Sequence, residues 1–75
     1  MLGVNIHEEI NYLAEKLELP YIYVKSMFNF LDNLVLGGLN NRESAREIVC
    51  YQYQLNKRLG EQVVNHYFKV YENIV

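Results

Sequence analysis

The residue types that most often carry chemistry are few and scattered in this 75-residue chain. Its two histidines, His7 and His66, lie in different segments, and neither belongs to an HExxH pair. Cys50 is the only cysteine, so the chain has no CxxC pair for zinc and no internal disulfide. Between Val49 and Tyr51, in an amphipathic segment, a thiol packs as a small inert hydrophobe far more often than it reacts. These patterns predict no catalytic, cofactor-binding or metal-ligating residue.

Acidic and glycine clusters fit structural roles better than catalytic ones. The glutamates at residues 8–9 and the pair Glu43 and Glu47 fall at predicted helix starts, where the macrodipole favours acids. The glycines at residues 37–38 are followed by Leu-Asn-Asn instead of Gly-Lys-Ser, so they do not form a phosphate-binding loop. We therefore expect that the chain is not an enzyme and that it binds no cofactor.

Tyrosine is the most unusual of the potentially functional residue types. Each ring brings a large apolar area and a hydroxyl that needs water or a partner, which is why tyrosine is enriched at interfaces. A core of this size cannot bury all of them. Three roles stay open: packing at the edge of a helical bundle, forming a protein or self-association surface, and stacking on single-stranded nucleic acid. The seven tyrosines are Tyr12, Tyr21, Tyr23, Tyr51, Tyr53, Tyr67 and Tyr71.

Apolar residues recur at helical spacing along the chain, which predicts an all-α fold of three or four helices. The first helix is expected over residues 5–19, with Asn5 as its N-cap and Glu8 as the capping-box partner. Pro20 suits the start of a second helix over residues 20–36. This second segment is the most apolar, so we expect it to be the central helix, ended by the paired glycines.

The second half of the chain is predicted to form one helix or two. A helix begins near residue 41, where Asn40 and Glu43 repeat the capping-box spacing. The apolar periodicity continues through Gly60, which would allow one long helix at the cost of a single glycine. The basic residues at positions 57–58 followed by Gly60 slightly favour a break there. The whole chain, residues 1–75, is expected to form a single helical domain.

Residues 10–29 carry six side chains at the core positions of a helix-turn-helix frame: Leu13, Ala14, Leu17, Leu19, Val24 and Met27. The segment therefore resembles the helix-turn-helix family, in which the small residue lets two helices cross closely. The turn position that usually holds glycine is Glu18 here. The resemblance implies base contacts from four residues of the second helix: Tyr21, Lys25, Ser26 and Asn29.

Charge opposes DNA binding by this segment. Residues 1–40 hold two lysines against five acidic residues, a net charge of −3, and the only arginines of the chain lie outside them. The whole chain carries a formal charge of −2. Phosphate would be repelled, and the commonest guanine contact has no donor. We therefore interpret residues 10–29 as a helical hairpin that does not bind DNA. A helix-turn-helix regulator that binds nucleic acid is kept as the alternative function.

A second likeness lies in LAEKLEL from residue 13, FLD at residues 30–32 and the glycines at 37–38. Residues 13–38 resemble the N-terminal helical hairpin of the HU family of histone-like bacterial proteins. The likeness covers only the dimerisation scaffold, because residues 41–75 are predicted to be helical and offer no counterpart of the basic arms. It implies a hairpin that is stable when it pairs with another copy.

Small size predicts self-association. A chain of this length buries only about 60–65% of its unfolded surface, which leaves many apolar groups in water. The carboxy-terminal apolar stripe is wide for a peripheral helix, so we expect a homodimer whose interface contains Val63, Tyr67, Val70, Tyr71 and Ile74.

The predicted function is that of a small non-enzymatic regulatory or protein-interaction protein. Its expected partners are a second copy and another protein. The longest apolar run has six residues, 34–39, so we expect no membrane partner. The lone cysteine and the absence of a recognisable leader in MLGVNIHEEI favour a cytoplasmic location.

Overall fold

The structure is a computed structural model that describes residues 5–74, and the side chains of residues 5–71. Its helices are α1 (Ile6–Leu17), α2 (Tyr21–Leu36), α3 (Arg42–Tyr53) and α4 (Lys57–Ile74). The described part of the chain contains no β-strand. The predicted all-α fold of three or four helices is therefore confirmed, and the described residues form four.

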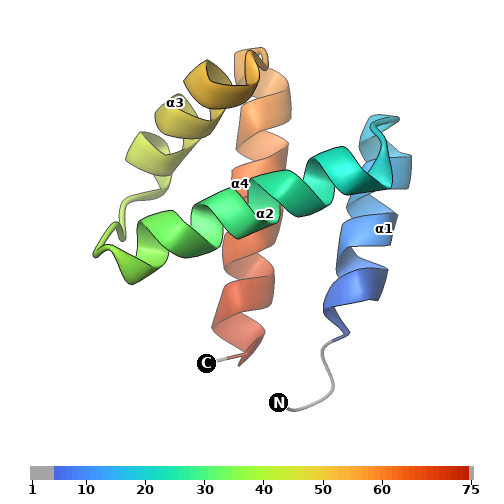
Figure 1. Cartoon of the computed structure of the whole chain (residues 1–75), viewed down its shortest axis with the longest axis horizontal. Coiled ribbons are helices and arrows are strands. Elements are labelled where there is room, and N and C mark those ends of the chain that lie inside the picture. Colours follow the sequence, from blue (N-terminus) through green and yellow to red (C-terminus); the bar gives the residue numbers. More distant parts are fainter. Residues whose placement is uncertain (1–4, 75) are drawn as a thin grey trace.

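Helices α2 and α4 cross at the centre of the bundle (Figure 1). Helix α1 lies beside the start of α2, and α3 lies on the opposite side of α4 from α1. Both α2 and α4 pack against all three other helices, whereas α1 and α3 do not pack against each other. The second helix is thus central, as its apolar sequence predicts.

Local side-chain chemistry sets the ends of α1. The side chain of Asn5 accepts hydrogen bonds from the backbone N–H groups of His7 and Glu8, which confirms Asn5 as the N-cap. The helix ends at Leu17, two residues earlier than predicted, because Glu18 takes the left-handed conformation with φ 58°. Glu18 therefore makes the tight corner that glycine usually makes in a helix-turn-helix turn.

The predicted cap of α3 was wrong by one residue. Asn41, not Asn40, is the N-cap, and its side chain accepts a hydrogen bond from the Ser44 N–H at 3.1 Å. Both asparagines follow the turn that contains Gly38, whose φ of 105° suits glycine. Two adjacent asparagines make the capping position ambiguous in the sequence.

The break in the second half of the chain lies at residues 54–56, not at Gly60. Gln54 takes a left-handed conformation, and the Asn56 side chain accepts a hydrogen bond from the Leu59 N–H at 2.8 Å. Gly60 is buried inside α4, where a Cβ would lie 2.1 Å from the Cys50 Sγ atom. Gly60 therefore allows α3 and α4 to approach each other, and it does not end a helix.

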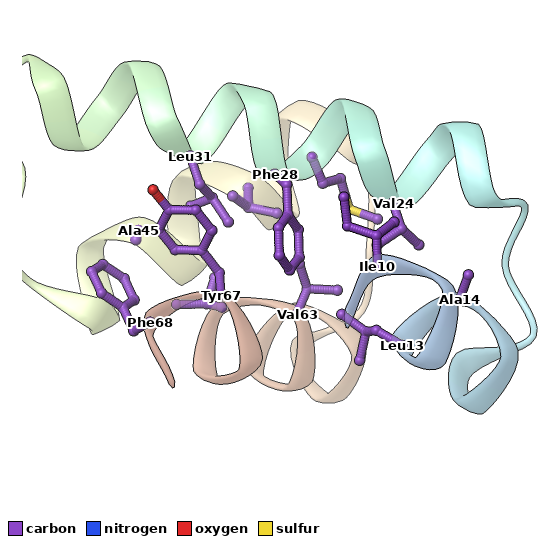
Figure 2. Close-up of a cluster of buried hydrophobic side chains, with 13 residues drawn as sticks. Ile10, Leu13, Ala14, Val24, Phe28, Leu31, Ala45, Val63, Tyr67 and Phe68 are labelled. Atoms are coloured by element: carbon purple, nitrogen blue, oxygen red, sulfur yellow. The ribbon is translucent and has the colours of Figure 1, made fainter. Parts of the chain in front are cut away.

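The core is a single cluster drawn from all four helices (Figure 2). Phe28 and Leu31 of α2 are 3% and 0% exposed, in agreement with the central position predicted for that helix. Helix α4 buries side chains on both sides of its apolar stripe, because α1, α2 and α3 surround it. Its buried residues include Val63, Val64, Tyr67, Phe68 and Val70.

Candidate functional site: a groove between α1, α2 and α4

A groove of about 470 Å³ lies between the start of α1, one side of α2 and the carboxy-terminal part of α4. Ile10, Phe28 and Val70 line its apolar floor, one from each helix. Pockets that bind ligands in proteins have this size and a similar mixture of an apolar lining with a few polar groups. The polar groups around the floor are His7, Tyr21, Lys25, Asn29, Asp32 and Tyr71.

Tyr67 connects the α4 side of the groove to α2. Its hydroxyl donates a hydrogen bond to Asp32 Oδ1 at 2.6 Å, and its ring meets Phe28 edge to face at 5.3 Å. Burial of the phenol, and then the hydrogen bond and negative charge of Asp32, raise the pKa of Tyr67 well above its ordinary value. The hydroxyl therefore stays a donor at physiological pH and holds the Asp32 carboxylate in place.

The α1 end of the groove is formed by a second polar pair. His7 Nδ1 and the Tyr21 hydroxyl share a hydrogen bond, and the two rings stack with their centroids 6.0 Å apart. His7 is positioned by the capped first turn of α1, and Tyr21 is the first residue of α2. The short corner between these helices therefore places both rings at one end of the groove.

Three of the four predicted nucleic-acid contacts line the groove: Tyr21, Lys25 and Asn29. Ser26 does not line the groove, and it shares a hydrogen bond of 2.8 Å with the Tyr53 hydroxyl. Lys25, Ser26 and Asn29 are exposed, whereas Tyr21 is half-buried. The groove therefore brings together three of the four residues and leaves Ser26 outside it.

The predicted dimer interface divides between core and surface. Val63, Tyr67 and Val70, which were expected at a dimer interface, are buried inside the single chain without a second copy. The physical reason is that α4 has neighbours on three sides. Tyr71 is 37% exposed and lies at the edge of the groove, and the Ile74 side chain lies outside the described residues.

The tyrosines differ in their surroundings. Tyr23 and Tyr53 meet edge to face at 5.5 Å, and the Tyr23 hydroxyl donates to the Tyr53 carbonyl oxygen at 2.8 Å. These two rings pack at the edge of the bundle between α2 and α3. Tyr12, Tyr51 and Tyr71 are exposed and remain available for contacts with another molecule.

Sequence patterns did not indicate the groove or the roles of His7 and Asp32 in it. Each pattern describes one helix, whereas the groove joins residues near both ends of the chain. The spacing of Phe28 and Asp32 by one helical turn was the available signal, because it places a carboxylate beside a core ring. Nothing in the sequence, however, paired that carboxylate with Tyr67.

The remaining chemistry-bearing side chains have structural partners. Cys50 is half-buried against Gly60, and its thiol donates to the Asn56 carbonyl oxygen at 3.6 Å. His66 Nε2 lies 2.9 Å from Glu9 Oε1 and joins α4 to α1. Over the described residues, no three His, Cys, Asp or Glu side chains gather into a metal site.

Comparisons with known proteins give no match among protein-family models, curated proteins or solved structures. None of the described helices is long and apolar enough to cross a membrane.

Proposed function

We propose that the protein is a non-enzymatic, regulatory interaction protein of the cytoplasm that binds another protein through the groove between α1, α2 and α4. The observation that carries this proposal is the apolar floor of Ile10, Phe28 and Val70, bordered by polar pairs held in fixed positions. An apolar floor with a polar edge is the arrangement into which an amphipathic helix of a partner lays its apolar face.

The apolar surface around the groove favours a protein over a small molecule. Ile6 is 40% exposed and Tyr71 is 37% exposed, and both lie at the groove. They extend the apolar area beyond the floor, so a partner helix would cover more surface than a small ligand inside the groove. Tyrosine at such an edge contributes apolar contact and a hydrogen-bonding hydroxyl at low entropic cost.

Affinity purification with paired tyrosine variants tests this proposal. Tyr71→Ala removes an exposed ring at the groove, and Tyr51→Ala removes the 87% exposed ring of α3 outside it. We expect a protein that co-purifies with the parent chain and with Tyr51→Ala, and whose recovery falls at least tenfold with Tyr71→Ala. Circular dichroism shows whether both variants stay folded. Equal recovery with both folded variants would contradict a role for the groove.

The proposal includes self-association. A chain this short leaves many apolar groups in water as a monomer, and several large ones are exposed here: Ile22, Leu36, Ile48 and Tyr51. A homodimer would cover part of this surface.

The corner between α1 and α2 favours nucleic-acid binding as the second candidate function. Glu18 adopts the left-handed turn, and Lys25 and Asn29 are exposed on the helix that follows. The net charge of −3 over residues 1–40 opposes it. Fluorescence anisotropy at ~150 mM salt is expected to show no sub-micromolar binding to duplex DNA. Tight, sequence-dependent binding that Lys25→Ala and Asn29→Ala abolish would instead establish this second function.

A further inference from the structure

Helix α2 carries a stripe of exposed residues along its whole outer face. Ile22 is 69% exposed near the start of the helix, and Leu36 is 85% exposed at its end. Ser26, Asn29 and Asn33 are exposed between them, and the spacing along the stripe alternates between four and three residues. This is the spacing by which one helix packs along another helix.

The stripe is complementary to itself when two copies of α2 run antiparallel. Ile22 lies seven residues before Asn29, and Leu36 lies seven residues after it. A two-fold axis at Asn29 therefore places each Ile22 against the Leu36 of the other copy, at both ends of the contact. The two Asn29 carboxamides meet at the axis, where each can donate to and accept from the other.

The charged residues beside the stripe are also complementary about the two-fold axis at Asn29. Lys25 and Asp32, which also line the groove, lie on the flank of the stripe that borders it, four residues before and three residues after Asn29. In an antiparallel pair the same flank of both copies lies on one side, so each Lys25 faces the Asp32 of the other copy. Within the described residues neither side chain takes part in an ion pair. The hydrogen bond from Tyr67 to Oδ1 holds Asp32 and leaves Oδ2 for a second donor.

We propose that the chain forms a two-fold dimer in which α2 packs antiparallel on α2 of a second copy, centred on Asn29. No other helix lies in front of α2 in Figure 1, so its outer face is open to a second copy. The inference rests on the self-association included in the proposed function, and it assigns the surface to α2 instead of α4. Only two aliphatic side chains per copy anchor the contact, so the dimer is weak and reversible.

Charge exchange between copies tests this arrangement. Lys25→Asp creates two repulsive pairs in a homodimer, and so does Asp32→Lys. We expect sedimentation equilibrium between ~20 µM and ~1 mM to show at least tenfold weaker self-association for each variant than for the parent chain. In an equimolar mixture of the two variants, we expect the association constant to return to within about threefold of the parent value. Each heterodimer of the two variants then has two attractive contacts between positions 25 and 32. Lys69→Asp on α4, with the same charge change, leaves association unchanged.

Variants that replace the apolar residues of the stripe with serine test the same surface and leave the hydrogen bond of Asp32 intact. We expect Ile22→Ser and Leu36→Ser each to weaken self-association at least tenfold. Tyr51→Ser, which alters a comparably exposed side chain on α3, should leave it unchanged. Circular dichroism confirms that each variant is folded at the concentration used.

Two results would overturn the inference, and they differ in what else they overturn. A parent chain that stays monomeric at ~1 mM rules out both the α2 contact and the self-association in the proposed function. Self-association that survives the α2 variants and is lost with Tyr51→Ser rules out only the α2 surface and leaves the homodimer standing.

Discussion

At the scale of single residues, the hydrogen bond from Tyr67 to Asp32 links two sides of the groove. It joins α4 to α2 at 2.6 Å, in a place where both the carboxylate and the phenol ring line the groove. In the sequence, Tyr67 belongs to the carboxy-terminal apolar stripe and Asp32 to the predicted second helix. Residues 35 positions apart leave no local pattern, so their pairing could not be predicted.

Tyr67→Phe tests the hydrogen bond. The change keeps the ring in the core and removes the donor to a charged acceptor, so we expect a loss of about 1–2 kcal/mol in the free energy of unfolding. Urea denaturation measures this loss. Tyr51→Phe changes an exposed hydroxyl and serves as the control, with no expected effect. Equal stability of the Tyr67→Phe variant and the parent chain would mean that the bond contributes nothing.

The same tyrosine predicts a pH dependence. Its pKa is raised in the folded chain, so the folded state keeps the phenol proton where the unfolded state loses it. This contribution to stability is fully present below pH ~10 and decreases as the pH rises above that value. We expect the free energy of unfolding to fall less steeply between pH 9.5 and 11.5 in Tyr67→Phe than in the parent chain. Parallel pH profiles would contradict the assignment.

At the scale of elements, sequence periodicity and caps predicted most of the helices. Asn5 was correctly placed, and Pro20, predicted as the first residue of the second helix, is its N-cap, one residue before Tyr21; caps and helix starts depend on neighbours only a few residues away. Gly60 was misinterpreted, because a glycine after two basic residues has the local pattern of a helix end. Its actual role depends on Cys50 of α3, which the local pattern around Gly60 does not include.

Gly60→Ala tests the close approach of α3 and α4. Alanine favours a helix over glycine by about 1 kcal/mol, but its Cβ would overlap the Cys50 sulfur. We expect the overlap to dominate, with a net loss of about 1–3 kcal/mol in unfolding free energy. In a Cys50→Ala background the loss should shrink or reverse, which a double-mutant cycle from urea titrations measures. A stabilising effect of Gly60→Ala alone would contradict this packing.

At the scale of the whole molecule, the crossing of α2 over α4 creates both the core and the groove (Figure 1). The sequence predicted the fold class and the central position of α2 because these follow from composition and periodicity. It did not predict the groove, which depends on how three helices cross. It also placed Val63, Tyr67 and Val70 at an interface, because a sequence does not show how many neighbours a helix has.

Leu31→Ala tests the shared core. Leu31 is fully buried on α2, so its truncation removes contacts that the cluster cannot replace. We expect a loss of about 2–5 kcal/mol, a large part of the stability of so small a domain. Leu36→Ala, at an exposed position on the same helix, is the matched control and should change stability little. Thermal unfolding compares the two, and similar melting temperatures would contradict the central position of α2.

Photo-crosslinking in cells shows whether a partner protein occupies the groove. A photoreactive phenylalanine analogue replaces Tyr71 at the groove or Tyr51 outside it, and the cells that make the protein are irradiated. We expect a covalent adduct with a different protein from position 71 and none from position 51. An adduct from position 51 with none from position 71 would contradict this expectation, and so would position 71 linking only to a second copy of this chain.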